Sequence, residues 1–226
     1  PNISRFIALC KKSKKTKLWT IADDYNQLQL LAQAAREKNL KVNVLLDVNL
    51  GMNRTGIPLD QAETKYRKYY DLDGINLDGL HCYDGHNNDA DPKTRIPKIA
   101  QADSDILKIK NSLEADKISC EIIIAGGTPS FSGHADNSNF YLSPGTIFLS
   151  DYGYYKNIPD LDITPAACLV TRVISHPATD IFAVDLGSKG IASDPAGIRG
   201  VILSMEDKTD ALFQSEEHWV FNEGGV

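Results

Sequence analysis

Short apolar runs alternate with longer stretches of helical period along most of the chain, and this alternation constrains the fold more than any other feature. It is typical of repeated strand–helix units, which build a parallel sheet flanked by helices. The apolar runs predict strands at residues 18–22, 42–48, 77–83, 120–125 and 146–149. The first part of the chain is therefore expected to be α/β.

Apolar residues at helical spacing predict the helices that accompany these strands. The pattern is clear at the start of the chain and between the first two strands, and weaker before the fourth. In that order the residues are Ile3, Phe6, Ile7 and Cys10; Leu28, Leu31, Ala32 and Ala35; Ile106, Ile109, Lys110 and Leu113. The whole predicts a partial (β/α)8 barrel of the TIM type, because closure needs eight strands and roughly three would be missing.

From about Thr164 the rhythm changes to short strands split by Gly, Pro, Asp and Asn turns. This pattern is typical of a β-rich domain. Strands are predicted at residues 166–174, 181–186, 201–205 and 218–221, and residues 157–165 read as a linker. We therefore expect residues 1–160 to form the partial barrel and residues 161–226 to form part of a β-rich C-terminal domain.

The composition is that of a soluble globular chain, with 226 residues, 42% hydrophobic content and a formal net charge of −6. The acidic balance argues against nucleic acid as a partner, and the lysine-rich segment 11–17 fits the C-terminus of a helix. No apolar stretch approaches the ~20 residues that span a bilayer, and no signal-peptide pattern begins the chain, so no membrane partner is expected. The 4 cysteines are widely separated and form no CxxC pair, which favours a cytoplasmic location.

Polar and glycine-rich segments follow the predicted barrel strands, where ligands of parallel α/β folds bind. The segment NLGMNRTG supplies Arg54, and HCYDGHN supplies His81, Tyr83 and His86. GGTPS follows the next strand, and SPG precedes the residue Thr146. Taken singly, each segment is an ordinary turn; taken together, an arginine, an aromatic ring and two glycine–hydroxyl turns suit an aromatic phosphorylated cofactor.

Six segments carry a family resemblance in the same order along nearly the whole chain: VNVLLDVNLGMNRTGI, LDGLHCYDGHN, IIIAGGTPSF, LSPGTIFLSDYGYY, DLGSKGIASD and QSEEHWVF. They resemble the D-threonine aldolase and D-serine dehydratase family, which is related to alanine racemase. The resemblance implies a pyridoxal 5′-phosphate barrel of the alanine racemase type (fold type III) followed by a β domain.

The resemblance also implies roles for individual residues. Arg54 would approach the cofactor phenolate or the substrate carboxylate, and Tyr83 would contact the pyridine face; these two are the candidate catalytic residues. Ser143 stands where alanine racemases carry an arginine aimed at the pyridine nitrogen. The implied phosphate cradle is Gly126, Gly127, Thr128, Gly145 and Thr146.

Two parts of the family's site have no counterpart among these residues. The resemblance places the Schiff-base lysine on a strand upstream of Pro1 and the ligands of a divalent metal, manganese or zinc, beyond Val226, so no metal residue is assigned. Lys189 in DLGSKG is a weak substitute for the lysine, because it follows a strand of the second domain. The chain alone is therefore expected to be inactive, and substantial cleavage of D-threonine by it would contradict this expectation.

The expected function is that of a lyase of amino acid metabolism acting on small D-β-hydroxy amino acids, with pyridoxal phosphate and a divalent metal. Aldol cleavage of D-threonine and dehydration of D-serine both remain open. An amino-acid racemase and a non-catalytic pyridoxal-phosphate-binding protein are the alternatives. The relatives imply a homodimer.

Overall fold

The computed structural model describes residues 2–137, 139–191 and 199–224. The chain divides into two compact units, Pro1–Phe148 with Ile158–Leu161, and Leu149–Asn157 with Asp162–Val226. Arg95 on the longest helix fixes Ile158–Leu161 to the first unit, because its fully buried guanidinium donates to the carboxylate of Asp160. None of the helices in the described part of the chain combines the length and apolarity that a bilayer crossing requires.

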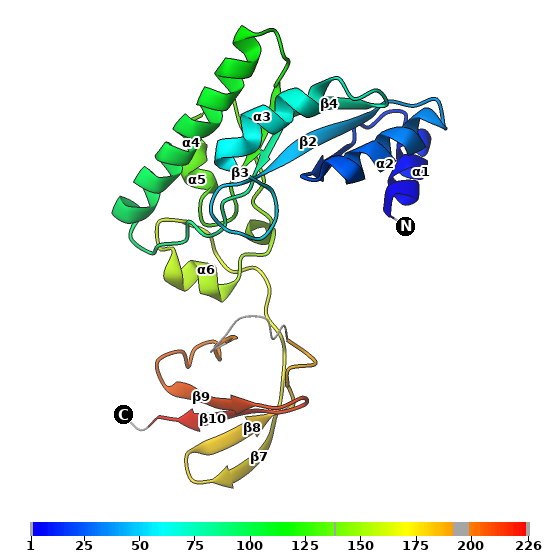
Figure 1. Cartoon of the computed structure of the whole chain (residues 1–226). Helices are drawn as coiled ribbons and strands as arrows, with labels where there is room; N and C mark the ends of the chain where they lie inside the picture. The colour runs from blue at the N-terminus through cyan, green and yellow to red at the C-terminus, as the bar shows by residue number, and fades with distance from the viewer. Residues whose placement is uncertain (1, 138, 192–198, 225–226) are drawn as a thin grey trace. The chain divides into compact units, whose positions relative to one another are not determined.

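The first unit is a parallel sheet covered by helices (Figure 1). Its strands run in the order β1-β2-β4-β5-β6, and β3 pairs with the end of β2. The strands are β1 (Trp19–Ala22), β2 (Val42–Asn49), β3 (Ile57–Pro58), β4 (Ile75–Cys82), β5 (Ile122–Ala125) and β6 (Tyr141–Leu142). The helices are α1 (Asn2–Lys12), α2 (Tyr25–Arg36), α3 (Leu59–Tyr70), α4 (Pro92–Ala115), α5 (Phe131–His134) and the 3-10 helix η1 (Thr146–Phe148).

The core of this unit lies between the sheet and its helices, as the apolar patterns predict. The residues predicted from helical spacing on α2 are buried, and they share one core with buried apolar residues of β2 and β4. Side chains with no exposed surface are Leu28, Ala32, Ala35, Val44, Leu46, Leu80, Ile106, Leu113 and Ile123. Asp24 caps α2 by accepting a hydrogen bond from the N–H of Gln27 at 2.9 Å, which fixes where this helix begins.

A bulge between β2 and β4 places a glycine against the next strand. The register shifts by one residue after Val44, so that Leu45 pairs with Gly79. Gly79 also pairs with Ile122 of β5, and a Cβ atom built on Gly79 would lie 1.7 Å from the carbonyl oxygen of Ile122. Only a residue without a side chain permits this approach of β4 to β5.

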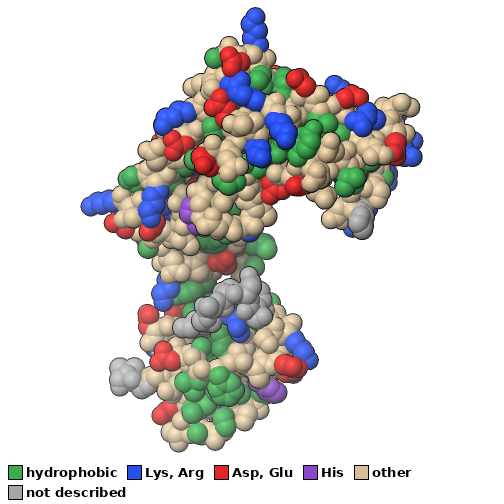
Figure 2. Space-filling view, in the orientation of Figure 1, with side chains coloured by type: hydrophobic (Ala, Val, Ile, Leu, Met, Phe, Trp, Pro, Cys, Tyr) green, Lys and Arg blue, Asp and Glu red, His purple; other side chains and the backbone are tan. Residues whose placement is uncertain are grey.

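The second unit is β-rich, as predicted. Its antiparallel sheet has the order β7-β8-β10-β9, built from β7 (Val173–Ala178), β8 (Ile181–Val184), β9 (Thr209–Gln214) and β10 (Trp219–Glu223), and α6 (Tyr152–Asn157) belongs to the same unit. A small core of Phe182, Val184, Trp219 and Phe221 holds the sheet together. Other apolar residues, among them Ile174 and Phe213, are exposed, and Figure 2 shows hydrophobic side chains at the surface of this unit.

The predicted barrel strands at 18–22, 42–48, 77–83 and 120–125 are confirmed as β1, β2, β4 and β5. The strand predicted at 146–149 is wrong: Thr146–Phe148 is a 3-10 helix, and Phe148 is 83% exposed. The place beside β5 is taken by β6, four residues earlier, as the last strand in the sheet order. The whole remains the α/β, partial-barrel fold that the alternation predicts.

In the second unit, the strands predicted at 181–186 and 218–221 are confirmed as β8 and β10. The strand predicted at 201–205 is wrong, since this segment forms turns, and the one predicted at 166–174 overlaps β7 only at its end. β7 contains His176 and Pro177 and every one of its residues is exposed, so it lacks the apolar alternation by which strands are predicted.

Candidate functional site

The carboxyl ends of three neighbouring strands bring the predicted site segments together. Asp47 of β2 pairs with His81 of β4, and Cys82 of β4 pairs with Ala125 of β5. The segments that follow these strands, residues 50–56, 83–91 and 126–130, therefore leave the sheet at the same edge.

Arg54, Tyr83 and Gly127 meet at this edge, where Arg54 is exposed, Tyr83 is half-buried and Gly127 is buried. The guanidinium carbon of Arg54 lies 4.4 Å from the centroid of the Tyr83 ring, a cation–π distance. A Cβ atom on Gly127 would lie 2.9 Å from Cε2 of Tyr83, so the tyrosine ring packs directly against the backbone of the glycine turn. Residues from three separate segments of the sequence thus meet at one edge of the sheet.

A largely buried hydrogen bond between an imidazole and a carboxylate lies beside Arg54. His81 donates from Nδ1 to Oδ1 of Asp47 at 2.7 Å, and the Asp47 side chain is only 6% exposed. Burial alone would raise the pKa of Asp47, but the hydrogen bonds from His81 and Thr55 and the charge of Arg54 outweigh it and lower that pKa. Asp47 is therefore a carboxylate at neutral pH. The sequence offered His81 as a candidate imidazole and gave no signal for Asp47, which lies inside an apolar run.

In the glycine turn after β5, the hydrogen-bond donors of one residue, Thr128, have no partner within the described residues. Gly126 adopts a φ of +82°, which a residue with a side chain rarely adopts. The N–H of Gly127 donates to Oγ of Ser130 at 2.9 Å and is thereby occupied. Within the described residues, no hydrogen bond engages the N–H or the hydroxyl of Thr128, whose side chain is almost wholly buried. Donors that have no partner within the protein are available to bind an anion, and the N–H and hydroxyl of Thr128 are two such donors.

The other residues predicted to bind the phosphate, Gly145 and Thr146, make no hydrogen bond to this turn within the described residues. Gly145 and Thr146 are exposed, and a Cβ atom on Gly145 would meet no heavy atom within 4 Å. Ser143 reaches the glycine turn instead: its hydroxyl donates to the carbonyl oxygen of Gly126 at 2.8 Å, and its N–H donates to that of Ala125 at 3.1 Å. The assignment of Gly145 and Thr146 to a phosphate stays a prediction.

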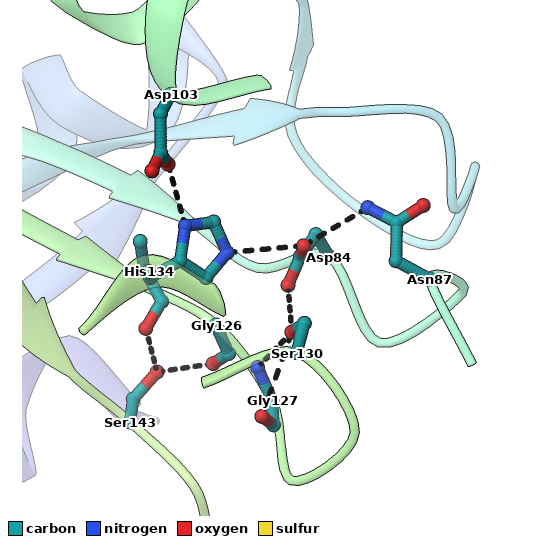
Figure 3. A network of polar contacts seen from close by, with 9 residues as sticks. Asp84, Asn87, Asp103, Gly126, Gly127, Ser130, His134 and Ser143 are labelled. Carbon is teal, nitrogen blue, oxygen red and sulfur yellow. Dashed lines mark hydrogen bonds and ion pairs between the residues drawn. The ribbon is translucent and has the colours of Figure 1, made fainter. Parts of the chain in front are cut away.

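A polar network, here called the Asp84 network, joins the turn after β4 to the glycine turn after β5 (Figure 3). Its members are Asp84, Asn87, Asp103, Ser130 and His134. The imidazole of His134 lies between two carboxylates, 3.1 Å from Oδ2 of Asp84 and 2.5 Å from Oδ1 of Asp103. Asp84 and His134 have no exposed side-chain surface.

The charge state of the Asp84 network follows from these hydrogen bonds. Burial alone would lower the pKa of His134, but the hydrogen bonds to Asp103 and Asp84 outweigh it and raise the pKa to about 9. Burial likewise opposes ionisation of Asp84, yet the hydrogen bonds from His134, Ser130 and Asn87 lower the pKa of Asp84. At neutral pH, His134 is thus an imidazolium that donates to both carboxylates. The sequence gave no signal for this network, because its members are scattered over some 50 residues.

Lys189, the weak candidate for the role of the family's Schiff-base lysine, is an exposed surface residue of the second unit. Its ammonium lies 2.8 Å from Glu216 and 3.2 Å from Glu217. The hydrogen bonds to Glu216 and Glu217 raise the pKa of Lys189, which keeps the amine protonated and poorly nucleophilic. Within the described residues, no group of three or more His, Cys, Asp or Glu side chains could hold a metal ion.

A helix-covered parallel sheet with its polar loops at the carboxyl edge, followed by a separate β unit, defines an α/β-barrel protein with a C-terminal β domain. Comparison with known families then places the chain. Residues 8–153 match the model of the alanine racemase N-terminal domain, and the chain belongs to this family. The resemblance predicted from the sequence motifs is thereby confirmed.

Individual relatives agree with this placement. The chain is 24% identical over 198 residues to a D-threonine aldolase from an Arthrobacter species, covering 84% of this chain and 52% of the relative. A solved D-threonine aldolase from Filomicrobium marinum matches with a TM-score of 0.84 and 26% identity, covering 98% of this chain and 60% of that one. The D-threo-3-hydroxyaspartate dehydratase from Delftia sp. HT23 shares the fold, with a TM-score of 0.79, 18% identity and coverage of 98% and 63%. The chain thus spans about half the length of the first of these relatives.

Proposed function

We propose that this chain carries a pyridoxal-phosphate site of an enzyme that acts on D-configured β-hydroxy amino acids, by aldol cleavage or by dehydration. The observation that carries the proposal is the meeting of Arg54, Tyr83 and the turn Gly126–Thr128 at one edge of the sheet. The similarity to D-threonine aldolases and to a hydroxyaspartate dehydratase supports the choice of substrate class.

The residues at this edge fit the cofactor. The unpaired N–H and hydroxyl of Thr128 suit a phosphate. The positive φ of Gly126 turns the backbone out of the extended conformation of β5, shortly before these donors. Gly127 supplies space for the Tyr83 ring and uses its own N–H internally. Ser143, with its hydroxyl on Gly126, presents no positive charge at the position where alanine racemases carry an arginine.

When bound, pyridoxal phosphate withdraws electron density from the α-carbon of the amino acid attached to it. The residues of this chain would bind and orient the reactants. The fixed charge of Arg54 would hold a phenolate or a substrate carboxylate, and its stacking on Tyr83 restricts where that charge can lie. Asp47, ionised and tied to His81, restrains the strand ends on which Arg54 and Tyr83 depend.

Replacing Thr128 with alanine tests the phosphate site. We expect Thr128→Ala to weaken binding of pyridoxal 5′-phosphate about tenfold, because a hydrogen bond to a charged group is worth about 1.5 kcal/mol or more. Binding of pyridoxal, which lacks the phosphate, should change by less than about twofold. Affinities are measured by tryptophan fluorescence quenching or calorimetry.

The matched control is Thr64→Ala, which removes the same hydroxyl from an exposed position on α3 and should leave both affinities unchanged. Equal losses for the two ligands in Thr128→Ala would contradict the assignment of Thr128 to the phosphate. A wild-type chain that binds pyridoxal as tightly as pyridoxal phosphate would contradict the site altogether.

The reaction class is tested on the enzyme that contains this chain, supplied with pyridoxal phosphate and manganese or zinc. We expect acetaldehyde and glycine from D-threonine, or ammonia and a 2-oxo acid from D-serine, and neither from the L-enantiomers. Racemisation of D-alanine without either product would favour the alternative function of the family.

A further inference from the structure

The Asp84 network places charged side chains in the interior of the first unit. Charged groups are costly to bury, and well-packed apolar residues of the same volume commonly stabilise a fold as well or better. Here two side chains with no exposed surface, Asp84 and His134, are nevertheless ionised. The geometry of the network shows what it does that apolar packing could not.

Asp84 uses both carboxylate oxygens to tie separate segments together. It follows Tyr83 directly, in the turn after β4. Its Oδ1 accepts a hydrogen bond from the hydroxyl of Ser130, in the turn after β5, and its Oδ2 accepts from His134 on α5 and from Asn87. On its far side, His134 is held by Asp103 of α4. The turn that carries Tyr83 is thereby fixed to two helices and to the neighbouring turn.

Ser130 closes this arrangement into a ring of contacts. Its Oγ donates to Asp84 and at the same time accepts from the N–H of Gly127 at 2.9 Å. Gly127 in turn packs against the Tyr83 ring, which is covalently adjacent to Asp84. One oxygen atom therefore sets the distance between the aromatic ring and the glycine turn.

We propose that Asp84, Ser130 and His134 are positioning residues, which hold Tyr83 and the turn Gly126–Thr128 at the spacing that the ring and the phosphate of one cofactor molecule require. This inference rests on the proposed pyridoxal-phosphate site. It assigns the three side chains a role through their neighbours, without contact to the cofactor. The occupied N–H of Gly127 is the internal anchor of the cradle, and Thr128 is left to face the anion.

Replacing Ser130 with alanine tests the proposal, because it breaks the ring of contacts at its single bridging atom and leaves the His134 ion pairs in place. The matched control is Tyr66→Phe. The Tyr66 hydroxyl is also buried and also makes two hydrogen bonds, to the carbonyl oxygens of Leu77 at 3.0 Å and Ser119 at 2.7 Å, near the opposite edge of the sheet. Both variants lose one buried hydroxyl, so a general loss of stability affects both.

Two readouts are used on the full chain. Amide hydrogen exchange at Gly127, measured without ligand, reports the anchor itself, and we expect at least about tenfold faster exchange in Ser130→Ala and no change in Tyr66→Phe. Titration with pyridoxal 5′-phosphate, below the melting points of all variants, should show about tenfold weaker binding by Ser130→Ala and less than about twofold change in Tyr66→Phe. Ser130→Cys, which nearly keeps the side-chain volume, replaces Ser130→Ala where the latter does not fold.

The outcomes separate the two proposals. A wild-type chain that fails to bind pyridoxal phosphate overturns the proposed function, and the role of the network for a cofactor falls with it. If the wild-type chain and Ser130→Ala bind pyridoxal phosphate with equal affinity, only the positioning role is overturned. The same holds if amide exchange at Gly127 is unchanged in Ser130→Ala. Equal losses of affinity in Ser130→Ala and Tyr66→Phe also overturn it, because they show only that a destabilised fold binds less.

Discussion

Substituting Gly79 with alanine is expected to lower the unfolding free energy of the first unit by about 3 kcal/mol, toward the upper end of what overpacking costs. The added Cβ atom would lie 1.7 Å from the carbonyl oxygen of Ile122, and the atom it meets belongs to backbone that cannot rotate away. β4 and β5 would have to separate at the pair Gly79–Ile122, which lies in the same two strands that end directly before Tyr83 and Gly126. Urea unfolding followed by circular dichroism measures the change.

Gly145→Ala is the matched control for this prediction. Gly145 has no heavy atom within 4 Å of its missing Cβ position, so its substitution should change the unfolding free energy by less than about 0.5 kcal/mol. A Gly79→Ala variant as stable as the Gly145→Ala variant would show that β4 and β5 do not approach as closely as described. Because the site is built on these strand ends, weaker binding of pyridoxal phosphate should accompany the loss of stability.

Raising the pH from about 6.5 to about 9 is expected to destabilise the first unit through His134. In the folded chain the pKa of His134 is raised to about 9 from an ordinary value of 6.5. The stabilisation that it contributes is therefore complete below pH ~6.5 and is lost as the pH rises through ~9, and the difference corresponds to about 3 kcal/mol. Unfolding curves recorded across this range test the prediction.

Fluorine resonances of 5-fluorotryptophan separate the two units in this experiment, because Trp19 lies in the first unit and Trp219 in the second. In His134→Gln, the unfolding transition reported by the Trp19 resonance should no longer depend on pH between ~6.5 and ~9. The variant should also be less stable at neutral pH, because the carboxylates of Asp84 and Asp103 lose their cation. His176→Gln, an exposed histidine of β7, should keep the pH dependence. If the stability reported by Trp19 in the wild-type chain does not change over this pH range, His134 is neutral in the folded state.

Much of the barrel part was predictable because its signals are local. The spacing of Leu28, Leu31 and Ala32 predicts a helix with one apolar face, and this face is buried as expected. The run that became β5 is apolar on both faces, as buried parallel strands are, and the run that became β2 has one fully apolar face, formed by Val42, Val44, Leu46 and Val48. The strand predicted at 146–149 is wrong: the place beside β5 is taken by β6, a shorter segment that precedes the apolar run.

Contacts between side chains that are distant in the sequence could not be predicted from the sequence alone. Arg54 and Tyr83 could be singled out because Arg54 follows a predicted strand and Tyr83 ends one, and their contact follows from the parallel order of β2 and β4. His134 and Asp103 carried no such mark, because each sits within a stretch of helix and meets Asp84 only through the packing of α4 and α5. Side-chain chemistry that depends on three elements is not encoded in the spacing of any one of them.

The sequence by itself determined the α/β class, the family and the segments from which the site is built, because apolar periodicity and short motifs act over a few neighbouring residues. The tertiary structure alone decided which polar groups are free and which are occupied. The N–H of Gly127 is taken by Ser130 while that of Thr128 is left unpaired within the described residues. The physical reason is that hydrogen-bond partners are chosen by distance in space, which the sheet order and the packing of the helices fix.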